Sequence, residues 1–272
     1  MMTRILRFSV LPLLCCAIAP SLRSQIPTAE TEYENGMVAR QKIDLDGALS
    51  HLQRAVDLDP SMIRAHFALG LTAQDLSGPQ SSPRRDMGAI AIREYKKVLE
   101  LNASHAEAAM NLAYLLYSFG DLAESERYYR KALDFRQDDA EAACGVAALD
   151  AKRGWSDVAE TRNNLKLSSE KLLIDSPSCR NVRDRNLMRF EEGIALLTRA
   201  REAAPDNVEL VGFLNMLYRG RAQIQCGNRS VYEADEDIAR KWDRMEKEML
   251  KKREPGHAFP RCPPAPPPMP DR

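Results

Sequence analysis

One spacing of small and large residues recurs along the chain, and its period restricts the fold more than any other feature. A small residue is followed by a large one four positions later, by a small or β-branched one three further on, and by a closing position five beyond that. Copies that begin at Ala91, Ser125 and Gly193 are separated by 34 and then 68 residues, which is one period and then two. The four copies are Ala48, Leu52, Ala55, Pro60; Ala91, Tyr95, Val98, Ala103; Ser125, Tyr129, Ala132, Gln137; and Gly193, Leu197, Ala200, Pro205. A fixed period of this length is typical of stacked units that bury one continuous core.

A helix-like segment precedes each copy. These segments contain no internal proline and place apolar residues at helical intervals. Gly36, Gly70 and Ala113 lie mid-segment, where a tiny side chain lets a neighbouring helix approach closely. Aromatic residues make up 6% of the chain and glycine occurs 13 times, which favours helices over sandwiches, barrels and Gly-rich nucleotide folds. We therefore expect an all-α chain built from antiparallel helix pairs.

This pattern resembles the tetratricopeptide repeat (TPR) family. The resemblance rests on the 34-residue period, the small residue in each first helix, the small–large–small ladder and the closing Pro60 and Pro205. It is close over residues 29–139 and looser over 140–254; the family's early Trp is absent, and Ala103 and Gln137 replace the closing proline. The resemblance implies a right-handed α-solenoid of about five helix pairs that binds other proteins and does no catalysis.

The spacing divides the helical region into five units. They span residues 29–62, 63–105, 106–139, 140–207 and 208–254. Two insertions are expected, one at 77–88 and one as a loop at 175–184, around Pro177. Two regular repeats within 140–207 also fit the period, but they lack a credible first helix.

The last unit is expected to close the array. Its final helix carries a single apolar stripe on an otherwise charged surface, as suits the end of a solenoid. The stripe consists of Ile238, Trp242, Met245 and Met249. The alternative is a helix that binds a partner or a membrane surface.

Both ends of the chain differ from the repeats. Residues 1–24 predict a secretory signal peptide, with a basic start and an apolar run from Phe8 to Ala19 that is too short to span a bilayer. An uncleaved anchor is the alternative; lipid attachment at Cys15 or Cys16 is disfavoured. Residues 255–272 hold 8 of the 16 prolines, which predicts a disordered or polyproline II tail. We expect an exported protein of a bacterial periplasm or cell envelope, with no transmembrane span once the leader is removed.

Four cysteines follow the leader, and an exported chain can oxidise them. Three pairings of Cys144, Cys179, Cys226 and Cys262 are possible. Cys179 with Cys226 is favoured because both lie near predicted helix ends in the C-terminal half; free thiols are the alternative. No C-x-x-C spacing occurs and the four histidines are scattered, so no zinc site is predicted.

No catalytic or nucleotide-binding motif is present, so we predict no catalytic, cofactor-binding or metal-binding residues. Equal numbers of basic and acidic residues, 39 each, argue against nucleic-acid binding.

The family resemblance places the first helices on a concave face that holds a protein or peptide partner. The candidate groove residues are Tyr33, Met37, Phe67, Leu71, Met110, Tyr114 and Tyr117. A cluster of Lys, Arg and Asn that would grip a peptide carboxylate is not assembled, although Arg40, Arg64 and Asn111 lie nearby. The alternatives are that these side chains fill the core, or that the chain is an accessory subunit or chaperone of an envelope enzyme or assembly machine.

Overall fold

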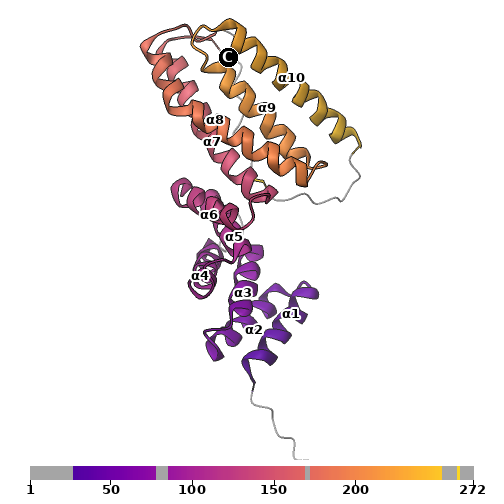
Figure 1. Ribbon diagram of the computed structural model, residues 1–272. Helices are drawn as coiled ribbons and strands as arrows, with labels where there is room; N and C mark the ends of the chain where they lie inside the picture. Colours follow the sequence, from indigo (N-terminus) through magenta and orange to yellow (C-terminus); the bar gives the residue numbers. More distant parts are fainter. Residues whose placement is uncertain (1–26, 78–84, 169–171, 253–261, 264–272) are drawn as a thin grey trace, which may run out of the picture.

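The structure, a computed structural model, describes residues 27–77, 85–168, 172–252 and 262–263. Within these residues it contains ten α-helices and no strand (Figure 1). The helices are α1 (Ala29–Gln41), α2 (Leu45–Leu58), α3 (Ile63–Leu76), α4 (Arg85–Leu101), α5 (Ala106–Ser118), α6 (Leu122–Phe135), α7 (Ala140–Asn164), α8 (Pro177–Ala203), α9 (Val208–Gln223) and α10 (Arg229–Lys252). The all-α prediction is confirmed.

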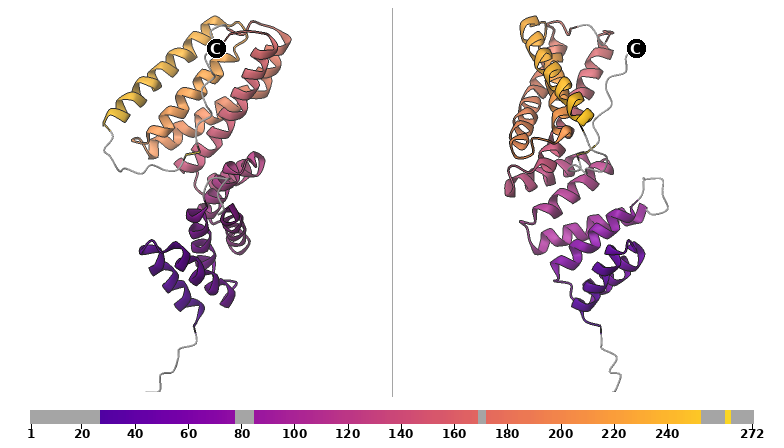
Figure 2. Two further views of the ribbon diagram at one scale, coloured as in Figure 1. Left: turned by 180° about the vertical axis from the view of Figure 1, so that it is seen from behind. Right: turned by 90° about the vertical axis from the view of Figure 1, so that its right-hand side faces the viewer.

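Consecutive helices pack as pairs, and the pairs stack into an elongated array (Figure 2). Three of the four neighbouring pairs of first helices also touch one another: α1 with α3, α5 with α7, and α7 with α9. These contacts draw the first helices together into the inner layer of the array. The architecture is that of a TPR solenoid, as predicted.

Local signals in the sequence start and stop these helices. The Asp44 carboxylate accepts a hydrogen bond from the Gly47 backbone N–H at the start of α2, and Asp121 accepts one from Glu124 at the start of α6. Such caps satisfy backbone donors that have no partner within the helix. Gly120, with φ at +86°, allows the sharp reversal between α5 and α6.

The repeated ladder of small and large residues forms the contact surface between helices. The first three positions of every copy are buried, and Leu52, Tyr95 and Tyr129 are among the largest fully buried side chains. A Cβ on Gly36 would lie 2.6 Å from Leu52 Cγ, and one on Gly70 would lie 2.7 Å from Tyr95 Cε1. The small positions are therefore small because a large side chain of the next helix occupies the space.

Gly145→Ala is expected to lower the free energy of unfolding by about 2 kcal/mol, because overpacking outweighs the gain in helix propensity. The added Cβ would lie 2.4 Å from Cζ of the buried Tyr129 ring. Gly212→Ala is the matched control, since its Cβ meets only the flexible end of the Glu246 side chain. Urea unfolding of both variants measures the difference. Equal shifts would contradict close packing at Gly145.

The expected loop at 175–184 is wrong. Pro177 occupies the first turn of α8, and the Ser176 hydroxyl accepts a hydrogen bond from the Cys179 backbone N–H. Proline is tolerated in a first helical turn, where its missing N–H needs no partner. The extra residues of this unit instead lengthen its helices, to 25 residues in α7 and 27 in α8. In the other expected insertion, residues 78–84 lie outside the described ranges and 85–88 belong to α4.

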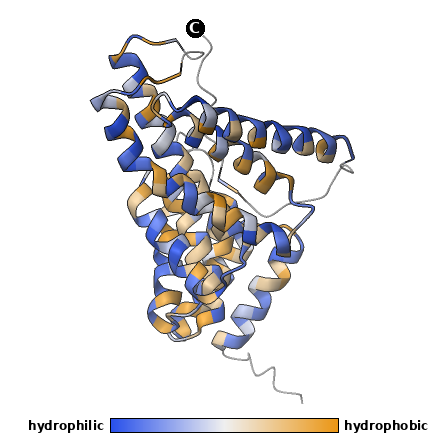
Figure 3. Ribbon diagram, turned by 45° about the horizontal axis from the view of Figure 1, so that its top comes forward, coloured by the Kyte–Doolittle hydropathy of each residue, from blue (hydrophilic) through white to orange (hydrophobic). Residues whose placement is uncertain are grey.

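The last pair covers the end of the array. The expected stripe of α10, from Ile238 to Met249, is half-buried, and α10 packs against α9. Figure 3 shows the hydrophilic character of most of α10. Arg221 of α9 forms an ion pair with the buried Asp235 of α10, with 2.5 Å between nitrogen and oxygen. Among the described helices, none is both long and apolar enough to cross a membrane.

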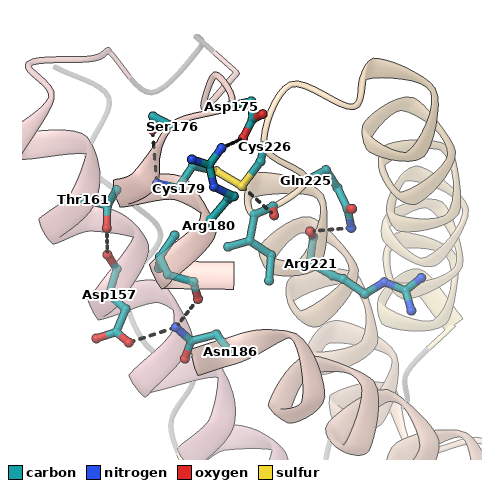
Figure 4. Close-up of a disulfide and its surroundings, with 12 residues drawn as sticks. Asp157, Thr161, Asp175, Ser176, Cys179, Arg180, Asn186, Arg221, Gln225 and Cys226 are labelled. Atoms are coloured by element: carbon teal, nitrogen blue, oxygen red, sulfur yellow. Dashed lines mark hydrogen bonds and ion pairs between the residues drawn. A yellow bond between two sulfur atoms is a disulfide. The ribbon is translucent and has the colours of Figure 1, made fainter. Parts of the chain in front are cut away.

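Two disulfides occur in the part of the chain that the structure describes. Cys179 of α8 is bonded to Cys226, just after α9, with their Cα atoms 5.6 Å apart (Figure 4). This is the pair that the sequence analysis favours. Cys144 of α7 is bonded to Cys262, which lies 118 residues later.

The ends of the chain are described only in part. The expected signal peptide, 1–24, lies outside the described residues, as does the tail except for Cys262 and Pro263. The Cys262 backbone N–H donates a hydrogen bond to Glu209 Oε2 of α9 at 3.2 Å, in addition to the bond with Cys144. At Cys262 a covalent bond holds the predicted disordered or polyproline II tail against α7, and the rest of that prediction falls on residues outside the described ranges.

Candidate functional site

A groove of about 490 Å³ opens on the inner layer, where α3, α5 and α7 follow one another (Figure 1). Three successive helix pairs contribute to it. Its lining residues are Phe67, Leu71, Glu107, Met110, Asn111, Arg136, Asp139, Ala140 and Glu141. The groove therefore brings together three of the predicted residues, Phe67, Leu71 and Met110, from two neighbouring units.

The apolar floor is held by packing beneath it. The Phe67 ring lies 4.7 Å from the His105 ring and 5.9 Å from the Tyr95 ring, measured between centroids. Phe67, Leu71 and Met110 are each half-buried and pack against the main core. They thus offer part of their apolar surface to the groove from fixed positions.

Charged side chains stand around this floor. Arg136 Nη2 lies 2.6 Å from a carboxylate oxygen of Asp139, and its Nη1 lies 4.0 Å from Glu107. Asp139 also accepts a hydrogen bond from the Ala142 backbone N–H and so caps α7. Three carboxylates and one guanidinium therefore line the groove, with the guanidinium paired to two of the three.

The other predicted residues lie elsewhere. Tyr33 and Met37 pack against a separate cluster formed by α2 and α3, and the Arg64 guanidinium covers the Tyr33 ring at 4.9 Å. Tyr114 is half-buried against the main core. Tyr117 is only 7% exposed, burial raises the pKa of its hydroxyl, and the Lys152 ammonium lies 5.0 Å from its ring. The Tyr117 ring is thus part of the core and not of the accessible groove.

The arginines near the inner layer already have partners. Arg40 donates hydrogen bonds to the Thr72 hydroxyl at 2.7 Å and to Asp75 at 2.9 Å. Arg64 forms an ion pair with Glu30. Neither arginine is among the residues that line the groove.

The charged residues of the groove are not among the residues predicted from the sequence, although the sequence holds a signal for them. Glu107 and Glu141 occupy the second position of α5 and α7, and they are 34 residues apart, one repeat period. Equivalent positions of neighbouring repeats lie on the same face, so both carboxylates meet in one groove. Among the described residues, no group of three or more His, Cys, Asp or Glu side chains is arranged to hold a metal ion.

Known proteins resemble part of this chain in sequence or most of it in fold. Residues 88–142 match the tetratricopeptide repeat family model. The crystal structure of MamA protein is similar at a TM-score of 0.54 and 17% identity, over 82% of this chain and 92% of that one. The crystal structure of YrrB, described as a TPR protein with an unusual peptide-binding site, is similar at a TM-score of 0.52 and 14% identity, over 82% and 92%. No curated protein sequence shows significant similarity to the chain.

The solved structures are distant in sequence and support the fold alone, whereas the family match is to the repeat itself. That match covers α4 from Gly88 onward, all of α5 and α6, and every position of the ladder copies that begin at Ala91 and Ser125. The spacing, the stacked helix pairs and the match at residues 88–142 together make the chain similar to proteins of the tetratricopeptide repeat family.

Proposed function

We propose that this protein is a non-catalytic scaffold or adaptor that holds a segment of another protein in the groove of α3, α5 and α7. The observation that carries the proposal is the convergence of Phe67, Leu71 and Met110, from two repeats, on one open groove of about 490 Å³. An apolar floor with polar groups at its edge suits an extended or helical peptide, whose side chains supply apolar area while its backbone meets the polar edge.

We place this function in an oxidising compartment, the periplasm or cell envelope. Two observations support that location: the leader-like composition of residues 1–24, and the bonding of all four cysteines beyond it into disulfides. Disulfides persist in exported proteins and are rare where thiols are kept reduced.

A random 12-residue peptide library displayed on phage tests the groove. We expect peptides to be enriched on the immobilised protein, and Phe67→Ala/Met110→Ala to weaken binding of the enriched peptides roughly 10- to 100-fold, because the apolar floor is lost. Fluorescence anisotropy of labelled peptides measures affinity, and circular dichroism measures folding.

Met188→Ala is the control, since Met188 is 79% exposed on α8 and does not line the groove. If the double variant loses its helical circular dichroism signal, peptide binding is compared instead between the unmodified protein and the single variant Met110→Ala. Absence of enrichment on the unmodified protein, or undiminished binding to a folded groove variant, would overturn the proposal.

A further inference from the structure

A short segment from the C-terminal end of the chain is bound to the inner layer beside the groove. Cys262 is half-buried and the next residue, Pro263, is buried, although neither belongs to a helix. The segment contacts two different first helices. Cys262 is bonded to Cys144 of α7, and its backbone N–H donates a hydrogen bond to Glu209 Oε2 of α9 at 3.2 Å. A non-helical piece of chain therefore joins α7 to α9.

The place of this segment is equivalent to the groove, one helix pair further along. Met110 and Glu141, which line the groove, are the fifth residue of α5 and the second residue of α7. Cys144 and Glu209 are the fifth residue of α7 and the second residue of α9. Equivalent positions of stacked repeats lie on the same face. Cys262 thus occupies, between α7 and α9, the kind of place that is an open groove between α5 and α7.

The groove and the bound segment are neighbours on α7. Cys144 lies four residues after Ala140 and three after Glu141, and both of these residues line the groove. Residues at such spacings share one face of a helix, with about 5–6 Å between their Cβ atoms. A partner segment that runs along the inner layer from the groove toward α9 therefore meets Cys262 and Pro263 after about one helical turn of α7.

We infer that the inner face of α7 and α9 is a second binding surface for a proline-containing segment, which Cys262 and Pro263 occupy, and that a dithiol reductant opens it to the partner segment held in the groove. The opening rests on the function proposed above, whereas the surface does not. A competing peptide cannot displace a covalently bound occupant at any concentration. After reduction, the segment is only a tethered competitor, with an effective concentration of about millimolar order.

The opening is a thiol–disulfide exchange. A thiolate of the reductant attacks one sulfur of the Cys144–Cys262 bond and releases the other cysteine; the second thiol of the reductant then releases the first cysteine from the mixed disulfide. In total, the reductant loses two electrons and two protons and becomes a disulfide, while Cys144 and Cys262 become thiols. The segment keeps the hydrogen bond to Glu209 and the buried Pro263, which contribute little against the conformational freedom that it regains.

Coupling of a peptide to Cys144 tests the surface by itself. The protein is full-length Cys262→Ala, and the probe is a fluorescein-labelled peptide with the sequence of residues 259–266, including its cysteine. In a glutathione buffer, the thiols of the peptide and of Cys144 form a disulfide, and glutathione disulfide takes up their two electrons and two protons. We expect coupling to be roughly 10-fold or more stronger than for a scrambled peptide without proline after the cysteine, because only the native order fits the surface. Mass spectrometry measures the product.

Cys226→Ala is the matched control, because it frees Cys179, which is also fully buried but lies against the connection between α9 and α10. Neither peptide should couple preferentially to Cys179. Equal coupling of both peptides to Cys144 would overturn the inference. If Cys262→Ala loses its helical circular dichroism signal, the comparison is repeated with trimethylamine N-oxide, which favours the folded state. Equal coupling under that condition has the same meaning.

Phage selection repeated on Cys144→Ala/Cys262→Ala tests the opening. We expect the enriched peptides to bind the oxidised unmodified protein roughly 3- to 10-fold more weakly than this variant, and dithiothreitol to remove the difference. Peptides enriched on Cys179→Ala/Cys226→Ala should bind that variant and the unmodified protein equally. Equal binding to the oxidised protein and to a folded Cys144→Ala/Cys262→Ala would overturn the opening. Absence of enriched peptides would instead remove the proposed function, and the coupling experiment would still decide on the surface.

Discussion

Replacing Cys144 and Cys262 together by alanine is expected to lower the free energy of unfolding of the C-terminal helices by about 4 kcal/mol. Their disulfide spans 118 residues, from α7 across α8, α9 and α10. Closing so long a loop removes much of the conformational entropy of the unfolded chain, which is the main source of disulfide stabilisation in the chain-entropy description. Cys144 is fully buried, so alanine is a better replacement there than a polar residue.

Guanidinium unfolding followed by circular dichroism measures this effect, with and without reductant. Cys179→Ala/Cys226→Ala is the comparison, since its bond spans 47 residues and should contribute about 1 kcal/mol less by the same argument. Reductant should lower the free energy of unfolding of the unmodified protein by more than it lowers that of either double variant, because each variant has only one disulfide left to reduce. The Cys144–Cys262 bond would be shown not to stabilise the fold if its removal left the unfolding midpoint unchanged.

Asp150→Asn is expected to stabilise the protein by about 2–4 kcal/mol at pH 8. Asp150 lies in α7 and is 1% exposed, and no described group gives its Oδ2 a hydrogen bond. Burial raises the pKa of this carboxyl from 3.8 to about 7, and the charge of Glu192 adds to the effect. Above that pH, the folded protein holds a buried carboxylate that asparagine replaces by a neutral group of similar size.

The raised pKa of Asp150 determines how the stability of the protein changes with pH. The unfolded chain loses the Asp150 proton near pH 3.8, whereas the folded protein keeps it up to about pH 7. The contribution of this group to stability therefore falls as the pH rises between these values, and its full penalty applies above pH 7. The advantage of Asp150→Asn should accordingly be larger at pH 8 than at pH 5. Unfolding midpoints at both values test this, with Asp138→Asn, at an exposed position, as the control. An advantage independent of pH would show that Asp150 titrates normally.

Much of the helical scaffold follows from local patterns. The small and large positions at Ala48, Leu52 and Ala55 recur with the period, and each lies where neighbouring helices press together. Asp44 and Asp121 cap helices through short-range hydrogen bonds that a few residues of sequence specify. The start of α8 was predicted wrongly because proline is compatible both with a loop and with a first helical turn, and Ser176 decides between them only through its capping bond.

The groove was predictable only in part. Phe67, Leu71 and Met110 could be assigned to the inner layer because helix position repeats with the period. Whether an aromatic ring of the inner layer is accessible to a partner depends on the next helix pair. The lengthened α7 places Lys152 over the Tyr117 ring, whereas Phe67 lines the open groove.

By itself, then, the sequence of this protein determined an all-α array of stacked helix pairs, since a 34-residue period and a ladder of small and large residues dictate which faces must be buried. Tertiary structure alone decided which side chains share the groove, that Cys144 pairs with Cys262, and that Asp150 lies buried where no described residue gives its Oδ2 a hydrogen bond. The physical reason is distance along the chain. Helix formation and capping act over a few residues, whereas these features join residues up to 118 positions apart, and only the stacking of the pairs brings them together.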